Sequence, residues 1–483
     1  MLQNKDIKKI SELKNGFTHR WFEPDFILGS LKCFSFSALC KYLEPLKLRG
    51  YSFEVIFSSL ICLPFLGLKT VNSLINSMLA SYIEARKDTY YRLKNNPGIC
   101  WRMILWLFSS KFIKIADANG EINSEAVRCL VFDDSTLPKT GKYIEKLSRV
   151  WDHVLNRFIL GYKLLAMGYW DGISFIPLDF SLHREKGRNA NKPFGFKNKE
   201  YRKQYRKKRQ KGTYTWERAK EADSTKIESA LKMFWRAISQ GIKVDYALMD
   251  SWFTCEAFIR AVNKVKSQTV HLIGMYKTPK TNFNYSNQKL TYSQIRNILG
   301  KAKRCRKLRL YYKEAVVSYN EHTLKMFFSR QGKKGKWRVF ITTDTDLSFI
   351  RMIEIYQIRW IIEVFFKEAK QLLGLEKCQS NDFDAQIADT TITMIQHILL
   401  TLKYRFDHYE SKGALFEQVR GNIVQSRLNE RLWALFIELL RLIEVLFDGI
   451  DEMEILERIL NDEKAYEVIN RLLQNELNLK NAA

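Results

Sequence analysis

Apolar residues in the first quarter of the chain recur every three or four positions. Phe53, Ile56 and Leu60 follow this spacing, and charged residues occupy the opposite faces. The pattern predicts amphipathic helices, so residues 1–122 are expected to form a helical domain. Within it, residues 85–94 interleave Lys and Arg with tyrosines. Such a surface suits contacts with DNA phosphates, although a structural domain with a solvated basic face has the same pattern.

A different pattern follows the helical region, with short apolar runs separated by turn residues. The first run, 129–132, leads directly into Asp133 and Asp134. Two longer runs, 159–170 and 173–182, are joined by an Asp-Gly pair, which is a strong signal for a β-hairpin. We therefore expect three successive strands, the first of which ends in carboxylates.

The next segment alternates between helical and strand-like spacing. Residues 216–239 have helical spacing, and the short strand-like run 243–250 ends in Asp250. A helical stretch at 255–265 and a strand-like run at 269–276 follow. A strand–helix–strand unit places loop residues at the carboxyl end of its first strand, where functional sites form.

Residues 278–337 interrupt this alternation, because Asn, Ser, Lys and Gly become frequent. Strand-like runs at 308–317, 323–329 and 337–342 predict an inserted β subdomain. Beyond residue 389 the spacing is helical again.

A helix without Gly or Pro is predicted at residues 355–370. Tyr356, Glu363 and Lys370 follow one another at seven-residue spacing, and Arg359 precedes Glu363 by four residues. Residues at these offsets share one helix face. Spacing alone is equally typical of a solvated helix with a weak Arg359–Glu363 ion pair.

The charge balance indicates a polyanionic partner. The chain has 79 Lys and Arg against 52 Asp and Glu, a formal net charge of +27. Nucleic acid fits this surplus better than a membrane surface does. The segment 184–211 alone holds 13 Lys and Arg with interleaved aromatics. It is expected either to contact a DNA backbone or to form a solvated loop.

Other chemistries have weaker support. The eight cysteines are scattered without a C-x-x-C pair, which is typical of free thiols in a reducing compartment. No Gly-rich phosphate loop is present, so no nucleotide cofactor is expected. The most apolar stretch, 55–68, is too short to span a bilayer, so we expect a cytoplasmic protein without a membrane partner.

The pattern Tyr356-x2-Arg359-x3-Glu363-x6-Lys370 resembles the YREK signature of the DDE transposases of the insertion-sequence-four family. The segment 249–253 is similar to the family's motif around its second Asp. The similarity extends from about residue 130 to residue 404. It implies an α/β fold, with a ribonuclease H-like mixed sheet, an inserted β subdomain and helical regions at both ends.

The resemblance also implies a division of the chain. The expected parts are a helical DNA-binding domain at 1–122, the first part of the core at 123–277 with a basic loop at 184–212, the inserted β subdomain at 278–337, the second part of the core at 338–408, and a C-terminal helical region at 409–483 that closes the fold or forms a dimer.

In the resembling family three carboxylates hold two Mg²⁺ ions, with Mn²⁺ as a substitute. Hard oxygen ligands converging from separate elements suit such ions. The candidates here are Asp133, Asp250 and Glu363, and Asp134 is the alternative first Asp because neighbours on a strand point to opposite faces.

The remaining signature residues are expected to hold DNA next to the scissile bond. Tyr356, Arg359 and Lys370 would bind phosphates, because Arg grips a phosphate through paired hydrogen bonds and Lys acts as a point charge. Trp252 is a candidate for stacking on an unpaired base, or else a packed core aromatic.

These features imply a nucleoid-associated prokaryotic transposase. It would bind terminal inverted repeats, act as a homodimer on DNA, cleave with metal ions and join the ends to target DNA. A nuclease without strand transfer, or a domesticated DNA-binding protein without catalysis, are the alternatives. Whether excision passes through a DNA hairpin is open.

Overall fold

The computed structural model of the chain describes residues 30–47, 49–77, 85–119 and 126–406, together with residues 412, 415, 416, 462 and 464. The chain divides into two compact units, and the elements below belong to the larger one, Phe34–Pro64 with Lys69–His408. The expected C-terminal helical region at 409–483 and the start of the N-terminal region lie almost wholly outside the described residues.

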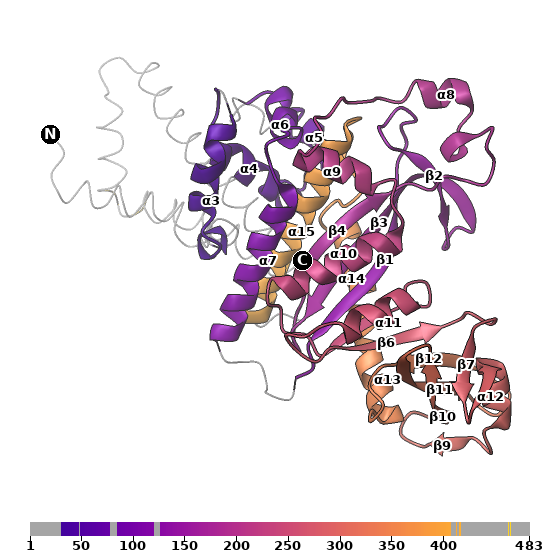
Figure 1. Cartoon of the computed structure of the whole chain (residues 1–483). Coiled ribbons are helices and arrows are strands. Elements are labelled where there is room, and N and C mark those ends of the chain that lie inside the picture. The colour runs from indigo at the N-terminus through magenta and orange to yellow at the C-terminus, as the bar shows by residue number, and fades with distance from the viewer. Residues whose placement is uncertain are drawn as a thin grey trace, which may run out of the picture. The chain divides into compact units, whose positions relative to one another are not determined.

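The N-terminal part is helical, as the spacing predicts. Its helices are α3 (Phe36–Leu43), α4 (Phe53–Cys62), α5 (Val71–Ile75), α6 (Lys87–Lys94) and α7 (Trp101–Ala118). Side-chain caps set two of the starts, since Ser52 accepts from the backbone of Val55 and Thr70 from that of Ser73. The longest of these five helices, α7, packs against β4 (Phe175–His183) and α15 (Phe383–Phe406) (Figure 1).

The central layer is a mixed β-sheet. An antiparallel meander is formed by β1 (Cys129–Pro138), β3 (Arg157–Trp170) and β4, with β2 (Ser148–Asp152) also pairing with β3. The predicted Asp-Gly hairpin connects β3 and β4, and Gly172 adopts a φ of 106° there. On the other side of β1 lie β5 (Tyr246–Met249) and β6 (His271–Tyr276), both parallel to it.

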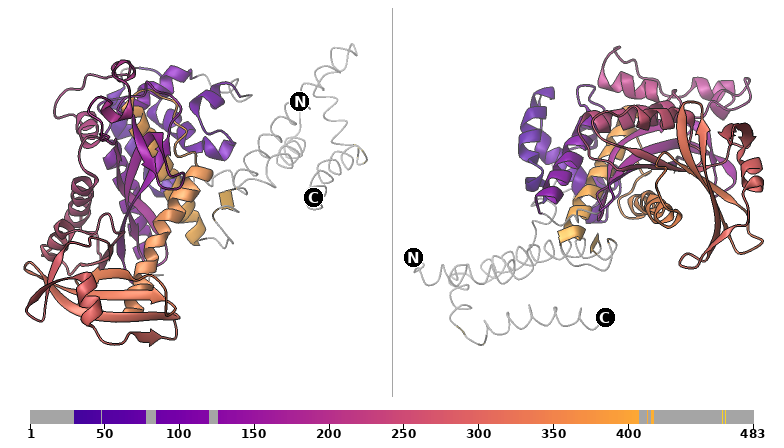
Figure 2. Two further views of the ribbon diagram at one scale, coloured as in Figure 1. Left: turned by 90° about the vertical axis from the view of Figure 1, so that its right-hand side faces the viewer. Right: turned by 60° about the horizontal axis from the view of Figure 1, so that its bottom comes forward.

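Helices cover both faces of this sheet (Figure 2). One face carries α10 (Lys226–Ser239) and α11 (Glu256–Asn263), while α14 (Ile361–Gln371) and α15 pack on the other. This order of strands and helices confirms the expected ribonuclease H-like α/β fold with flanking helices.

The strands predicted after residue 278 extend the same sheet. Among the described residues, twelve strands form one sheet, in which β12 pairs antiparallel with β6. The additional elements are β7 (Asn282–Tyr285), β8 (Gln288–Thr291), α12 (Tyr292–Ile298), β9 (Lys303–Cys305), β10 (Leu310–Tyr319), β11 (His322–Gln331) and β12 (Arg338–Thr342).

The helix predicted at 355–370 is tightened in its middle. The chain forms α13 (Phe349–Gln357), a 3₁₀ turn at Ile358–Trp360 and then α14. Backbone angles remain right-handed throughout, with φ −56° and ψ −30° at Ile358. Hydrophobic spacing does not report this change, because a single 3₁₀ turn displaces the following apolar positions only slightly.

The structure also bears on the expectations for the cysteines and for membrane-spanning helices. All eight cysteines are described and none forms a disulfide; three are buried, four are half-buried and Cys33 is exposed. In the described part of the chain, no helix has the length and apolarity needed to cross a membrane.

A buried ion cluster joins α7 to the sheet. The Asp179 carboxylate on β4 accepts from the Arg102 Nε at 2.9 Å and from the Arg236 Nε at 2.8 Å. Burial by itself would raise the pKa of Asp179, but Arg102, Arg236 and Arg218 outweigh burial and lower it to about 2. The carboxylate therefore stabilises the folded state as an anion.

We expect Asp179→Asn to destabilise the fold by about 3–5 kcal/mol, because Arg236 loses its carboxylate partner and Arg102 and Arg218 are left to share Glu221. The pKa of Asp179 is depressed in the folded state, so the difference from wild type should be full above about pH 4 and shrink as the pH falls toward 2. Denaturant unfolding at several pH values measures this difference.

The matched control is Glu354→Gln. Glu354 pairs with Lys307 at 2.7 Å, but the two side chains are 35% and 66% exposed. This variant should lose less than about 1 kcal/mol. Equal losses in the two variants, or a loss in Asp179→Asn that does not change with pH, would contradict the assignment.

Candidate active site

Asp133 and Asp250 each follow one residue of a directly paired couple on two adjacent parallel strands. Phe132 of β1 pairs with Met249 of β5, and each Asp is the next residue along its chain. Asp250 directly follows β5, as expected. Asp133 does not end its strand, because β1 continues to Pro138 by pairing with β3. The expectation that a strand ends at Asp133 is wrong. The polar residues after it remain in β1 because β3 continues beside them and pairs with them.

One guanidinium bridges two of the three candidate carboxylates. Arg359, in the 3₁₀ turn before α14, donates to the Asp133 Oδ2 at 2.8 Å and to the Glu363 Oε1 at 2.6 Å. The i,i+4 pair predicted from the sequence is therefore present. Asp133, which accepts from the same guanidinium, lies 226 residues before Arg359 in the chain. The same interaction brings the signature helix against β1.

Asp134 lies on the other face of the sheet, as strand alternation requires. Its Oδ2 is 3.1 Å from the Lys226 Nζ at the start of α10 and 3.8 Å from the Lys163 Nζ on β3. The two neighbouring aspartates thus have separate cationic partners. Of the pair, Asp133 is the one that shares a partner with Glu363.

The electrostatic environment of Asp133 is unusual for an aspartate. Burial, with smaller contributions from the charges of Asp250 and Asp134, raises its pKa to about 7, although the Arg359 charge and the backbone hydrogen bond from Asp134 oppose this. Burial disfavours the anion, and like charges nearby do the same. A cation close to Asp133 and Asp250 would stabilise their charged forms.

Asp250 is oriented by the turn that follows it. Its Oδ1 accepts from the backbone N–H of Trp252 at 2.9 Å and of Phe253 at 3.3 Å. The Thr254 hydroxyl donates to the Asp250 carbonyl at 2.6 Å. Gly274 on β6 leaves room for Thr254, because a Cβ at that position would lie 2.1 Å from the Thr254 Oγ1.

The other signature residues surround this group in different ways. Tyr356 packs against Phe340, with ring centroids 5.0 Å apart, and its buried hydroxyl finds no hydrogen-bond partner among the residues that the structure describes. Burial raises the pKa of Tyr356 to about 12, although the nearby Arg359 charge opposes this. The Lys370 Nζ donates to the Thr136 carbonyl at 2.8 Å, three residues beyond Asp133 on β1.

Trp252 is 62% exposed, so its interpretation as a packed core aromatic is wrong. The Lys226 Nζ lies 4.9 Å from its ring centroid. Lys226 therefore contacts both Trp252 and Asp134, a role that sequence analysis missed. The sequence does contain the capping box Thr225–Glu228 that begins α10, but a cap locates only the helix start.

The chemistry of these groups fits a divalent cation. Within the described ranges, no three His, Cys, Asp or Glu side chains already form a metal-binding group. Asp133, Asp250 and Glu363 nevertheless supply the hard oxygen ligands that Mg²⁺ prefers. At present the Arg359 guanidinium supplies the positive charge to two of them. Binding of an ion by all three requires the Arg359 contacts to rearrange.

Two family models match overlapping parts of the chain. One described as "Transposase DDE domain" matches residues 212–399, and one described as "DDE superfamily endonuclease" matches residues 73–274. The first match includes Asp250 and Glu363, and the second includes Asp133 and Asp250. A search of curated proteins found no match. The two matches show that residues 73–399 are similar to DDE transposase and endonuclease domains, which supports a transposase-type nuclease domain in this part of the chain.

Proposed function

We propose that this protein is a cut-and-paste DNA transposase of the YREK type. The observation that carries the proposal is the Arg359 bridge, which holds the carboxylate of Glu363 beside Asp133, next to the strand that ends in Asp250. These three acidic residues come from three separate elements, as phosphodiester cleavage with metal ions requires.

In this proposal Asp133, Asp250 and Glu363 hold Mg²⁺ or Mn²⁺, which supplies Lewis-acid activation of a phosphodiester and of the attacking oxygen. Arg359 leaves at least one carboxylate when DNA binds and pairs with a backbone phosphate instead. A guanidinium suits this exchange, because carboxylate and phosphate present similar paired acceptors. Lys370 and the Tyr356 hydroxyl would hold the adjoining phosphates once Lys370 leaves the Thr136 carbonyl and the buried Tyr356 hydroxyl becomes accessible.

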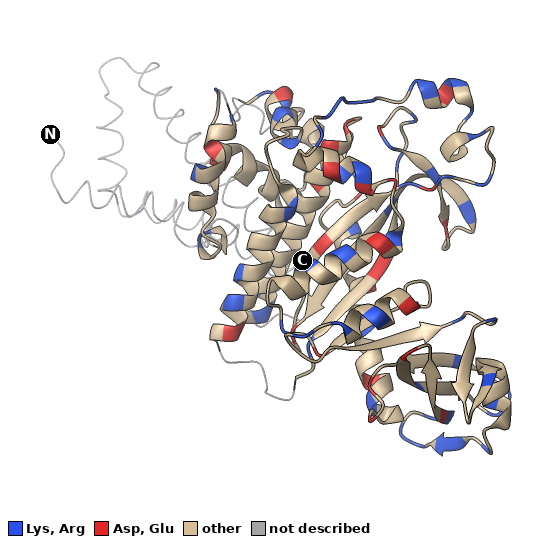
Figure 3. Ribbon diagram, in the orientation of Figure 1, with Lys and Arg blue, Asp and Glu red and all other residues tan. Residues whose placement is uncertain are grey.

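The surface charge supports a DNA partner. Figure 3 shows Lys and Arg at β9 and the turn after it, where Lys303, Arg304, Arg306 and Lys307 are exposed. On α6 the expected DNA-contacting segment is only partly available. Lys94 is buried and pairs with Asp389 at 2.5 Å, so it cannot reach DNA. Terminal inverted repeats and target DNA are the proposed substrates, with a homodimer as the active form.

The two alternatives differ from this proposal in measurable products. A nuclease would cleave end sequences without joining them to another duplex. A domesticated DNA-binding protein would bind DNA but would not cleave it. Incubation of the protein with a duplex bearing its terminal repeats and a circular target separates the three, because joined products arise only from a transposase.

We expect Asp133→Asn, Asp250→Asn and Glu363→Gln each to lower Mn²⁺- or Mg²⁺-dependent cleavage by more than about 100-fold, because each removes a proposed metal ligand. Binding of the repeat duplex in a gel-shift assay should be retained. Asp134→Asn is the matched control on the opposite face, and it should lower cleavage less. If Asp134→Asn is the inactive variant and Asp133→Asn cleaves normally, the choice of first Asp is wrong.

A second prediction separates the metal site from activity. In Arg359→Ala the carboxylates of Asp133 and Glu363 lose their shared cation, so the melting temperature should fall in EDTA. Addition of Mn²⁺ should then raise it more than in wild type, since an ion that binds the folded state stabilises it by mass action. Arg351→Ala, which removes an exposed guanidinium from α13, is the control and should respond to Mn²⁺ as wild type does. An unchanged response to Mn²⁺ in Arg359→Ala would show that the ion does not bind these carboxylates.

A further inference from the structure

A second candidate site lies on the segment that follows β4. A cavity of about 510 Å³ opens between the loop at 145–146, the end of β4, the segment 201–209 and α9 (Tyr214–Glu221). This volume is in the range of small-molecule sites, about 300–1,000 Å³. We call it the aromatic–basic pocket. Its cationic lining residues are Lys146, Arg184, Arg206, Lys207, Arg209 and Lys220.

The positive charges of the aromatic–basic pocket exceed their carboxylate partners. Lys146 and Arg184 both pair with Asp223. Lys207 and Arg209 pair with a group of three carboxylates. That group consists of Glu145, Asp382 and Asp384. Six cations therefore face four carboxylates, which leaves a surplus of two positive charges.

The surplus cations lie against aromatic rings. The Arg206 guanidinium is 5.1 Å from the ring centroid of Tyr201, and the Lys220 Nζ is 5.1 Å from that of Trp216. Among the described residues, neither cation has a carboxylate within ion-pair distance. A cation over a ring face keeps its charge available to an incoming anion.

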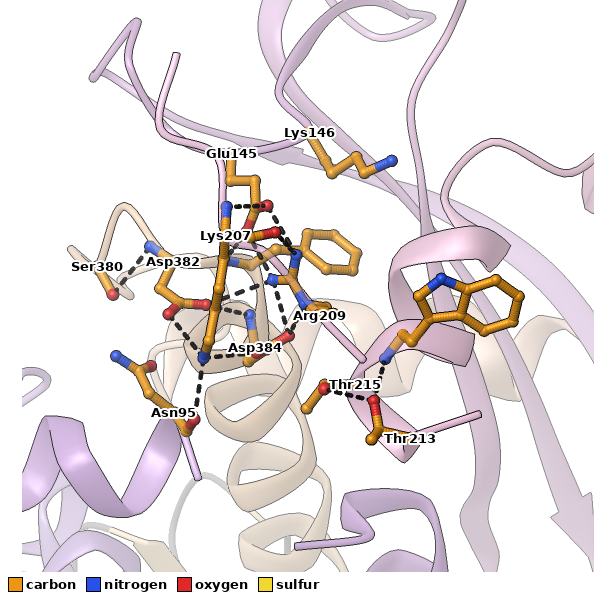
Figure 4. Close-up of polar contacts among 12 residues, drawn as sticks. Asn95, Glu145, Lys146, Lys207, Arg209, Thr213, Thr215, Ser380, Asp382 and Asp384 are labelled. Atoms are coloured by element: carbon orange, nitrogen blue, oxygen red, sulfur yellow. Dashed lines mark hydrogen bonds and ion pairs between the residues drawn. The ribbon is translucent and has the colours of Figure 1, made fainter. Parts of the chain in front are cut away.

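The base of the pocket is a rigid ion cluster (Figure 4). Arg209 donates to both oxygens of Glu145, at 2.7 and 2.6 Å, and these two side chains are each only 5% exposed. Lys207 donates to Asp384 at 2.8 Å and to the Asn95 carbonyl at 3.0 Å. This cluster fixes the segment to the start of α15, so the pocket is formed before any ligand binds.

Aromatic side chains form the walls. Tyr201 stacks on Phe194, with ring centroids 5.5 Å apart, and Arg184 covers the Phe194 ring at 3.6 Å. Trp216 lies in the first turn of α9, where its backbone N–H donates to the Thr213 hydroxyl at 3.3 Å. Both Tyr201 and Trp216 are partly exposed, which leaves ring surface for stacking.

We propose that the aromatic–basic pocket binds one nucleotide, with its base stacked on Trp216 and its phosphate between Arg206 and Lys220. A bare phosphate has no use for the aromatic walls. An uncharged aromatic ligand would leave the two surplus cations without a partner. A phosphorylated base satisfies both, since bases stack on any aromatic face and Arg and Lys bind the phosphate.

The sheet geometry favours a nucleotide of a DNA strand, and this choice of source rests on the proposed function. Asp133 lies three residues before Thr136, which pairs with Lys163 and, across β3, with His183 next to Arg184. Three residues and two strand spacings correspond to about 10 Å in each direction, or roughly 14 Å in all. That span is about four nucleotide steps at ~3.4 Å each. The edge of the aromatic–basic pocket at Arg184 therefore lies within a few nucleotide steps of Asp133, which favours a DNA strand as the source of the nucleotide.

Calorimetric titration of the full-length protein in EDTA tests the proposal without cleavage. The probes are a hexathymidylate oligonucleotide, thymidine monophosphate and inorganic phosphate. Trp216→Ala should weaken oligonucleotide binding by about 10-fold or more, and Trp216→Phe should restore most of it. Lys220→Gln, which alters an exposed side chain, should weaken binding and reduce its salt dependence.

Trp235→Ala and Lys232→Gln, which alter exposed residues of the neighbouring helix α10, are the matched controls and should bind as wild type does. The pocket assignment is overturned if Trp216→Ala and Lys220→Gln both bind hexathymidylate as tightly as wild type does. It is also overturned if inorganic phosphate binds as tightly as hexathymidylate and thymidine monophosphate do. If the monophosphate alone requires Trp216, the DNA source is overturned. These titrations measure binding without metal ions and do not depend on cleavage. Failure of the proposed function would instead be seen in the cleavage assay, where Asp250→Asn would cut as wild type does.

Discussion

The contact of the Arg359 guanidinium with two carboxylates allows Asp133 and Glu363 to lie close together in a partly buried site. Asp133 and Glu363 come from a central strand and from a helix on one face of the sheet, and Arg359 donates to both at 2.8 and 2.6 Å. Burial is the main cause that disfavours ionisation of Asp133, and the like charges of Asp250 and Asp134 add to it, so that its pKa is about 7. The Arg359 guanidinium, in the turn just before α14, favours the charged forms of both groups, and the folded chain therefore holds Asp133 and Glu363 together without a metal.

The β-sheet separates charges that the sequence places side by side. Asp133 and Asp134 are adjacent, yet one contacts Arg359 and the other contacts Lys226 at 3.1 Å on the opposite face. Period-two alternation is the whole cause of this separation. Each aspartate thereby gains its own counter-ion, and only one of them is left on the side of Glu363.

Sequence patterns predicted the features that depend on neighbouring residues. The Asp-Gly hairpin, the strand before Asp250 and the Arg359–Glu363 pair all follow from spacings of a few positions. The break in the signature helix at 358–360, the continuation of β1 beyond Asp133 and the exposure of Trp252 were not predicted. The length of β1, for example, is set by its pairing with β3, a strand farther along the chain.

The basic segment after β4 illustrates why local composition misjudges function. Its charges suggest a surface for DNA, but Lys207 and Arg209 bind Asp382 and Asp384, some 175 residues later. These cations fold the segment onto α15 and are not free for a ligand. The folded segment in turn presents Arg206 beside Tyr201, and Lys220 of the following helix lies beside Trp216. The basic residues thus divide into those that build a rigid base and those that remain available, and only the long-range ion pairs reveal which is which.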